Sequence, residues 1–451
     1  MKMSPDLPLL FATAILAGSL PSQCAPVLQP QGGVPGIYGI VYATTAWDPD
    51  GPGPAPALAI AAGQFSNVEG QPMNSIAAWD PTTNRWSPLG SGITGQFNDV
   101  RALTTAANGD LIAAGRFDFA GGNAAANIAR WDGTSWSPIG AGIPVNFAGW
   151  VTSLGTLSNG ELVAGGTFTT SQGAPATYLA RWNGVSWSQF GAPQWQVHAI
   201  TSAPNGDLLV AGGFPSIGVP GTNCLARWNG TSWSGIGGGI PGINISPILR
   251  AVAALPSGDI VVAGDFTGTG GISNIAYWDG VAWSSMAGGI LGLTAWVPAL
   301  AIAANGDVVV GGRFANLGGA SIVGAGRWNG TAWSPLGVGL ADASINSLTT
   351  MPNGDLFVGG FVEPNNGLLM PGVARFTGAW IPMSSEPGFA GEVHDIETLP
   401  NGDVLVGGAF QGVQGIRIRG VARRRGGRPT RRSEPSSRAT FATSCRSLAA
   451  T

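Results

Sequence analysis

One short motif recurs along most of the chain, and this recurrence limits the fold more than any other feature. The twelve residues LPNGDVLVGGAF occupy 399–410, and close variants begin at 106, 157, 203, 255, 303 and 351. The Asn or Ser residues of the successive turns are separated by 46 to 52 residues. A period of this length is typical of solenoids and propellers. We therefore expect one repeat architecture, even though 451 residues would otherwise suggest two or three domains.

Each period predicts four antiparallel strands. The runs VRALTTA (100–106) and LIAAGRF (111–117) are joined through Asn-Gly, which is a strong hairpin signal when both turn residues take positive φ. A second hairpin follows in IARWDGTSWSPIG (128–140), with its turn on Asp-Gly. Four antiparallel strands per period correspond to one propeller blade. The chain is thus predicted to be all-β.

Two further features recur at fixed blade positions. Paired tryptophans, such as Trp131 with Trp136, are predicted to fill the space between blades. A sugar-binding aromatic platform is the alternative for these rings. The acid of each turn recurs together with an Arg before the first Trp, as in Asp110 and Arg130, and this predicts a structural pairing.

The segment GGFPSIGVPGTNCLARWNGTSWSGIG (212–237) resembles the kelch repeat, because Gly-Gly ends its second strand and a Trp opens its fourth. The copies carrying NGD followed by VGG and an aromatic residue are also similar to bacterial delta-60-type propeller repeats and to the Rax2-like propeller. The resemblance covers roughly residues 40–420. It implies a propeller used as a binding scaffold and brings no catalytic residues with it.

We expect three regions: a signal peptide at 1–25, a propeller at 26–422, and an Arg- and Ser-rich tail at 423–451. Eight first hairpins but seven second hairpins can be counted, and 27–43 aligns with a fourth strand running into a first strand. This predicts a single propeller of eight four-stranded blades, with an N-terminal strand completing the last blade and removing exposed sheet edges. The tail is either a disordered basic extension or the product of a shifted reading frame.

The apolar run at 7–20 after Lys2 is typical of a secretory signal and too short for a membrane span. This predicts a secreted or cell-envelope protein without a transmembrane segment, with an untranslocated apolar N-terminus as the alternative. Before residue 417 the chain has 11 basic and 23 acidic residues, a charge near −12, which disfavours nucleic acid as a partner. The three cysteines allow at most one disulfide.

No catalytic triad, zinc spacing, phosphate-binding loop or paired-carboxylate motif can be assembled from the sequence. We expect no catalytic residues, no metal and no cofactor. The predicted function is that of an exported, non-enzymatic, monomeric binding or surface-scaffold protein that recognises a protein or glycan partner. A secreted propeller enzyme acting on polysaccharide, of lyase or oxidase type, is the alternative.

A candidate ligand site follows from the positions that differ between repeats. First strands line the channel of a propeller, and the residue after their opening apolar position varies: Tyr42, Arg101, Thr152, His198, Arg250, Pro298, Asn346 and His394. These side chains are predicted to surround one channel mouth and to bind a small anionic or sugar-like ligand through Arg101 and Arg250. Because both histidines belong to the set, binding is expected to weaken as the pH rises through about 6.5. A plain polar lining of a wet channel is the alternative.

Overall fold

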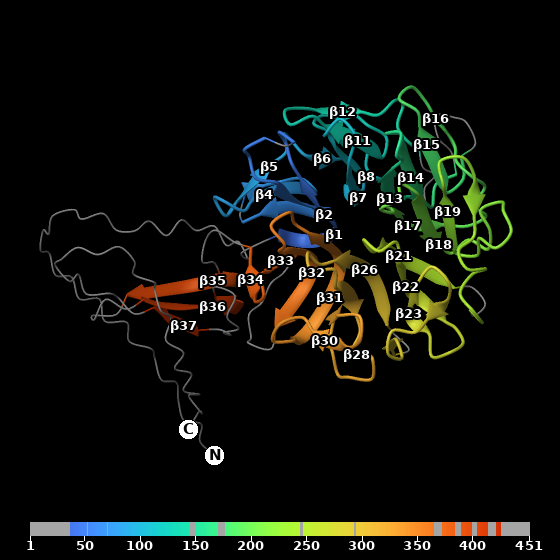
Figure 1. The fold of residues 1–451 in the computed structure, drawn as a ribbon. Coiled ribbons are helices and arrows are strands. Elements are labelled where there is room, and N and C mark those ends of the chain that lie inside the picture. The colour runs from blue at the N-terminus through green and yellow to red at the C-terminus, as the bar shows by residue number, and fades with distance from the viewer. Residues whose placement is uncertain are drawn as a thin grey trace, which may run out of the picture. The chain divides into compact units, whose positions relative to one another are not determined.

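The described residues form β-sheets and contain no helix. A computed structural model describes residues 37–51, 53–69, 71–144, 149–169, 176–243, 247–292, 295–364, 372–383, 389–398, 404–413 and 421–424, all within one compact unit of residues 32–451. Seven antiparallel sheets each contain four strands in meander order, and we call them blades 1 to 7 (Figure 1). The all-β prediction is confirmed.

The strands of the blades are as follows: blade 1, β1 (Ile37–Trp47), β2 (Leu58–Val68), β4 (Ile76–Asp80) and β5 (Arg85–Pro88); blade 2, β7 (Asp99–Thr105), β8 (Leu111–Arg116), β11 (Ile128–Trp131) and β12 (Trp136–Pro138); blade 3, β13 (Val151–Thr156), β14 (Leu162–Gly166), β15 (Leu179–Trp182) and β16 (Trp187–Gln189); blade 4, β17 (Val197–Ser202), β18 (Leu208–Gly212), β19 (Leu225–Trp228) and β20 (Trp233–Ser234); blade 5, β21 (Ile248–Ala254), β22 (Ile260–Thr267), β23 (Ser273–Trp278) and β24 (Trp283–Ser284); blade 6, β26 (Trp296–Ile302), β27 (Val308–Arg313), β29 (Ala325–Trp328) and β30 (Trp333–Pro335); blade 7, β31 (Leu340–Thr350), β32 (Leu356–Pro364), β33 (Val373–Phe376) and β34 (Trp380–Pro382).

The remaining strands are short or belong to the last repeat. Blade 1 also carries β3 (Gln71–Pro72), and the small sheets consist of β6 (Ile93–Thr94), β9 (Phe119–Ala120) and β10 (Asn123–Ala124), and of β25 (Ile290–Leu291) and β28 (Asn316–Leu317). The eighth repeat forms a three-stranded sheet of β35 (Phe389–Thr398), β36 (Val404–Val413) and β37 (Val421–Arg424).

The Asn-Gly turns differ from the predicted two-residue form. Gly109 has a φ of 89°, but the φ of Asn108 is not positive. The amide of Gly109 donates to the carbonyl of Ala106, and the amide of Ala106 donates to the carbonyl of Asp110, both at 2.9 Å. The loop therefore has three residues and needs left-handed geometry only at Gly109. The prediction of positive φ at both turn residues was wrong because the extra residue allows an ordinary right-handed turn before the glycine.

The second strand of each blade explains why its sequence is apolar without alternation. Every residue of β8 is buried. Leu111 and Ala113 pack in a core shared with blade 1, whereas Ile112 and Ala114 pack in a core shared with blade 3. Because alternate residues of a strand face opposite sides of the sheet, both faces of the strand are covered by neighbouring blades. Full burial of a leucine or isoleucine side chain stabilises the fold by about 1.5–3 kcal/mol.

Hydrogen bonds from tryptophan connect consecutive blades. The indole N–H of Trp136 donates to the carbonyl of Leu89 at 2.8 Å, and that of Trp187 donates to the carbonyl of Ile139 at 3.2 Å. The second ring of the pair is thus part of the structure between blades, as predicted. The two rings of a pair also contact each other, with centroids 5.4 Å apart for Trp131 and Trp136.

Blade 1 lies beside blade 7. The first strands contact one another in the order β1, β7, β13, β17, β21, β26 and β31, and β31 also contacts β1 (Figure 1). Asn346 of β31 donates from Nδ2 to the carbonyl of Val41 in β1 at 2.7 Å. A buried core joins Phe357 and Met351 of the seventh repeat with Trp79 of blade 1.

The predicted count of eight blades and their closure by an N-terminal strand are not confirmed. The sheet of the eighth repeat has three strands, and residues 26–36, which would supply its fourth strand, lie outside the described residues. The predicted signal peptide and the tail beyond residue 424 lie outside them as well. Cys224 is buried and unpaired, and burial raises the pKa of its thiol to about 12; Cys24 and Cys445 are not described.

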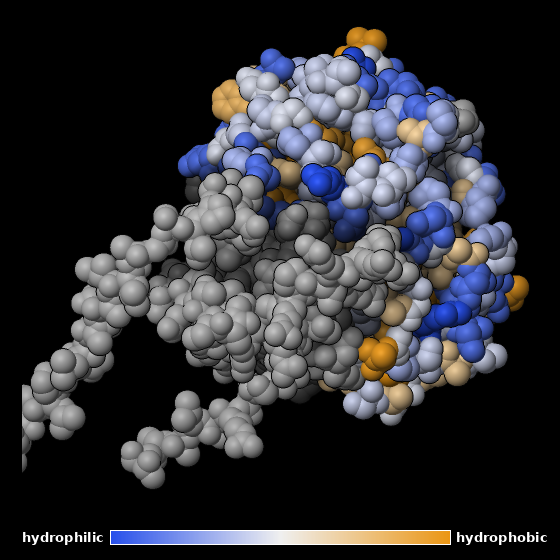
Figure 2. Space-filling view, turned by 90° about the vertical axis from the view of Figure 1, so that its left-hand side faces the viewer, coloured by the Kyte–Doolittle hydropathy of each residue, from blue (hydrophilic) through white to orange (hydrophobic). Residues whose placement is uncertain are grey.

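Some large hydrophobic side chains of the described residues are exposed. The most exposed are Val185 and Val281, 80% and 85% exposed, each at the tip of a second hairpin. Figure 2 shows such residues singly among hydrophilic ones on the described part of one face. Single exposed hydrophobic residues are normal on a protein surface, so they do not mark a binding surface.

Candidate functional site

Seven of the eight residues predicted at the channel mouth line one cavity. This cavity has a volume of about 360 Å³, and its lining includes Tyr42, Arg101, Thr152, His198, Arg250, Pro298 and Asn346. Each comes from the first strand of a different blade. The side chain of His394 lies outside the described residues. The predicted gathering is therefore found for seven residues, while ligand binding by them stays a prediction.

A β-bulge places each of these side chains. The pairing between first and second strands shifts register between Val100 and Ala102, which leaves Arg101 as the extra residue, and the same shift occurs at the counterparts of Arg101 in the other repeats. A bulge bends its strand and redirects one side chain. The strand ends of the repeat thus present one unpaired residue per blade to the cavity.

The bulge also explains the glycine at the end of each second strand. A Cβ atom added at Gly115 would overlap the carbonyl oxygen of Asp99, and one at Gly264 would overlap the carbonyl oxygen of Ile248. Glycine removes the side chain where the bulged strand approaches closely. This glycine was visible in the sequence as the end of the VAGG pattern, but its connection to the site was missed.

Arg101 is held between aromatic rings and a carboxylate. Its Nε and Nη2 donate to Oδ2 of Asp99 at 3.0 and 2.7 Å. Its guanidinium carbon lies 4.6 Å from the ring centre of Tyr42 and 5.0 Å from that of Trp150. Burial and the nearby Asp99 carboxylate raise the pKa of Tyr42, so this phenol stays protonated. The arginine is therefore oriented before any ligand arrives.

Arg250 is paired in the same way with an acid from the second strand of its own blade. Its Nε and Nη2 donate to Oδ2 of Asp265 at 2.9 and 2.5 Å. The other carboxylate oxygens, Oδ1 of Asp99 and Oδ1 of Asp265, are buried without a hydrogen-bond partner. Each arginine charge at the mouth is thus offset by one carboxylate. These two carboxylates weaken the predicted preference for an anionic ligand. Neither acid was recognised from the sequence as a partner of the arginines.

His198 is neutral at physiological pH. Burial, and then the positive charge of Arg250, lower the pKa of His198 to about 4, and its Nε2 is buried without a hydrogen-bond partner. The predicted loss of binding as the pH rises through 6.5 is therefore wrong for this residue. The sequence suggested an ordinary imidazole because it did not reveal how deeply the ring is buried.

Two residues of the predicted set serve contacts between blades. Thr152 donates from Oγ1 to the carbonyl of Val197 in blade 4 at 2.8 Å. Asn346 makes the corresponding contact to Val41 in blade 1. Their side chains line the cavity and also connect its walls, so their substitution would affect stability as well as binding.

The recurring acid and arginine form ion pairs between second and third strands. Nε of Arg375 donates to Oδ2 of Asp355 at 2.7 Å, and equivalent pairs join Arg130 to Asp110, Arg181 to Glu161, Arg227 to Asp207 and Arg327 to Asp307. In blade 5 the hydroxyl of Tyr277 replaces the arginine and donates to Asp259 at 2.5 Å. These pairs are structural, as predicted.

A family model matches part of the chain. It is described as a domain of unknown function (DUF5122) beta-propeller and matches residues 157–184, from the first turn of blade 3 to the turn of its second hairpin. The fold is a β-propeller. The finer kelch-like, delta-60-type or Rax2-like assignment is not confirmed.

Several solved propeller structures are similar to this chain at low identity. The extracellular domain of a putative hybrid two component system from B. thetaiotaomicron is 11% identical with a TM-score of 0.49, and the match covers 88% of this chain and 45% of that one. Virginiamycin B lyase from Staphylococcus aureus is 12% identical with a TM-score of 0.42, and the match covers 73% and 97%. The WD40 beta propeller domain of Doa1 is 15% identical with a TM-score of 0.43, covering 72% and 92%. No curated protein matches the sequence.

The described part of the propeller has neither a metal-binding cluster nor a membrane-spanning helix. No group of three or more His, Cys, Asp or Glu residues in this part is arranged to hold a metal ion. No helix in the same residues has the length and apolarity needed to cross a bilayer.

Proposed function

We propose that this propeller is an exported binding protein that recognises the hydroxyl-rich end of a glycan at the channel mouth. The observation that carries the proposal is the gathering of seven repeat-variable side chains around one cavity of about 360 Å³. Positions that keep their chemistry in every repeat build the blades, so the positions that vary are free to provide specificity. A cavity of this size is in the range that binds small ligands.

Charge pairing favours a neutral ligand over an anion. Arg101 and Arg250 each donate to a carboxylate, and the second oxygens of Asp99 and Asp265 have no hydrogen-bond partner. Arginine offers only donors and carboxylate only acceptors. The two acids do not line the cavity, so the arginines supply donors there, and the hydroxyl oxygens of Tyr42 and Thr152 can accept from a sugar hydroxyl. The rings of Tyr42 and Trp296 add apolar surface at the same cavity.

We further propose export through residues 1–25 and a monomeric propeller whose ring has seven blades, in place of the eight expected from the sequence. The contacts of β31 with β1 support seven. In this arrangement the eighth repeat does not lie between blades 7 and 1.

An array of neutral and acidic oligosaccharides, probed with the full chain, tests the proposed glycan site. We expect neutral glycans to bind and the Arg101→Ala/Arg250→Ala variant to lose at least about tenfold in affinity, since hydrogen bonds to charged groups contribute about 1.5–3 kcal/mol each. Arg227→Ala is the matched control, because it removes an arginine from an acid pair away from the cavity. Binding restricted to acidic glycans would contradict the neutral site, and turnover of a bound polysaccharide would favour the enzyme alternative.

A further inference from the structure

Two matching cavities lie between blades, away from the channel mouth. One of about 510 Å³ lies between blades 2 and 3, and one of about 460 Å³ lies between blades 5 and 6. Their linings correspond through the repeat, with Trp182 in the first at the position of Trp328 in the second. Since the same hollow occurs at two interfaces, it arises from the repeat and not from one irregular loop.

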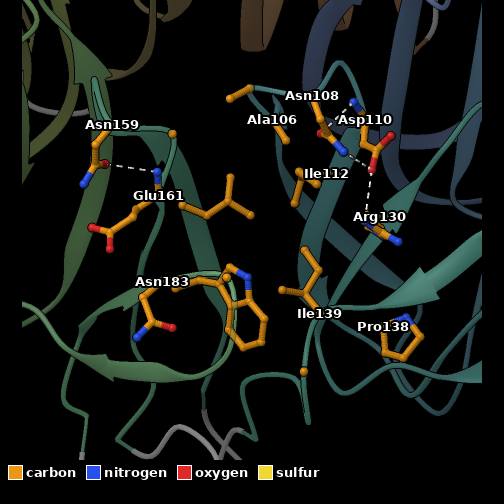
Figure 3. Close-up of a pocket in the computed structure, with 16 residues that line it drawn as sticks. Ala106, Asn108, Asp110, Ile112, Arg130, Pro138, Ile139, Asn159, Glu161 and Asn183 are labelled. Atoms are coloured by element: carbon orange, nitrogen blue, oxygen red, sulfur yellow. Dashed lines mark hydrogen bonds and ion pairs between the residues drawn. The ribbon is translucent and has the colours of Figure 1, made fainter.

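The cavity between blades 2 and 3 has apolar and polar walls. Figure 3 shows Ile112 and Ile139 of blade 2 facing the space from one side and Glu161 of blade 3 on the other, with the Asp110–Arg130 ion pair close by. An apolar wall with a few polar groups is typical of a site for a small organic group.

At the interface of blades 1 and 2, the same place is filled by a tryptophan of the chain itself. Trp47 pairs with Leu58 at the end of the first hairpin. Counting from the paired residues of the neighbouring strands, this is the position of Ala106 in blade 2. Trp47 is 4% exposed and packs in one core with Trp131.

The contacts of Trp47 show what this place accepts. Its indole N–H donates to the carbonyl oxygen of Gly109 at 2.8 Å. Gly160 and Gly306 are the counterparts of Gly109 in blades 3 and 6, and both line the open cavities. A planar aromatic ring with one donor therefore matches a binding position that the repeat provides at each of these interfaces.

Tryptophan or methionine at the position of Trp47 accompanies a well-buried tryptophan in the next blade. Trp131, which packs in one core with Trp47, is 7% exposed, and Trp79, in the core that contains Met351, is 2% exposed. Ala106 stands at this position between blades 2 and 3, and there Trp182 is only half-buried. Leu255 stands at the same position between blades 5 and 6, and Trp328 is half-buried there as well. Neither Ala106 nor Leu255 fills the place that the indole of Trp47 fills beside Trp131.

We propose that the cavities between blades 2 and 3 and between blades 5 and 6 each bind a tryptophan side chain of a partner polypeptide, in the place that Trp47 takes between blades 1 and 2. The indole packs against Trp182 or Trp328, and its N–H donates to the carbonyl of Gly160 or Gly306. This site is separate from the channel mouth and does not depend on the glycan proposal.

Titration of the full chain with 5-fluoroindole, followed by fluorine NMR, tests this proposal. We expect two bound probes per chain, one after either Ala106→Trp or Leu255→Trp, and none in the double variant, because the new ring fills the cavity. Val281→Trp is the control, since it adds a tryptophan at an exposed turn tip, and it should bind two. Unchanged binding in the double variant would overturn the proposal.

Two further measurements remain decisive if a filled variant folds poorly. Trp47→Ala opens the corresponding place between blades 1 and 2, so this variant should bind one additional probe and melt at a higher temperature when the probe is present. A crystal of the unaltered chain soaked with 5-bromoindole should show bromine between blades 2 and 3. Absence of both effects would overturn the proposal, as would methyl glucoside displacing the probe at equal concentration, which would indicate a sugar site.

Discussion

The indole N–H of Trp86 in blade 1 donates to the carbonyl oxygen of Met383, 297 positions later in the sequence, at 3.1 Å. The same bond joins Trp136 of blade 2 to Leu89 in the preceding repeat. Blade 1 therefore relates to blade 7 as blade 2 relates to blade 1. This relationship is what a ring of seven blades requires.

Trp86→Phe should lower the free energy of unfolding by about 1–3 kcal/mol, because it leaves a buried carbonyl without its donor. Trp136→Phe, which removes the equivalent bond, should have a similar cost. Urea unfolding of both variants provides the measurement. A negligible effect of Trp86→Phe beside a clear effect of Trp136→Phe would argue against closure between blades 7 and 1.

Gly115→Ala should destabilise the protein and weaken binding at the channel mouth. The added methyl group overlaps the carbonyl of Asp99, so the bulge that carries Arg101 must shift, at about 1–3 kcal/mol. Gly109→Ala is the comparison, since its φ of 89° costs about 1–2 kcal/mol but its Cβ meets no atom within 4 Å. Only Gly115→Ala should alter ligand affinity. Equal losses of affinity in Gly115→Ala and Gly109→Ala would show that the bulge does not position the binding residues.

The low pKa of His198 makes stability depend on pH in a defined direction. The pKa of His198 is about 4 in the folded chain and 6.5 ordinarily. The free energy of unfolding is therefore highest above pH 6.5, where the imidazole is neutral in both states, and decreases as the pH falls toward 4. The melting temperature should fall more between pH 7 and pH 5 in the unaltered chain than in His198→Gln. His394→Gln provides the control, and imidazole NMR signals of His198 that titrate near 6.5 would refute the assignment.

Asp99→Asn should change which ligands the channel mouth prefers. Removing this carboxylate leaves the charge of Arg101 without compensation, and we expect at least about a tenfold gain for acidic over neutral oligosaccharides at low salt. Asp207→Asn removes the partner of Arg227 away from the cavity and should leave the preference unchanged. An unaltered preference in Asp99→Asn would show that the arginine does not contact the ligand.

The repeat predicted much of the local structure. The strands, the turn glycine at 109 and the pairing of Asp110 with Arg130 follow from residues within one period, because hairpins and neighbouring strands are short-range structures. The gathering of residues such as Arg101 and Arg250 at one cavity also followed from the repeat. Equivalent residues of the blades lie at the same distance from the propeller axis and at the same height along it.

What the sequence alone determined is the unit: one four-stranded blade, repeated with a variable residue at the start of each first strand. What only the tertiary structure decided depends on how units meet. Contacts between blades decide whether Met383 or a later residue lies beside Trp86 and whether the imidazole of His198 is charged or neutral at pH 6. They also decide whether a cavity is left beside Ala106. Residues from distant repeats make these contacts, and burial and charge there depend on atoms that no local pattern specifies.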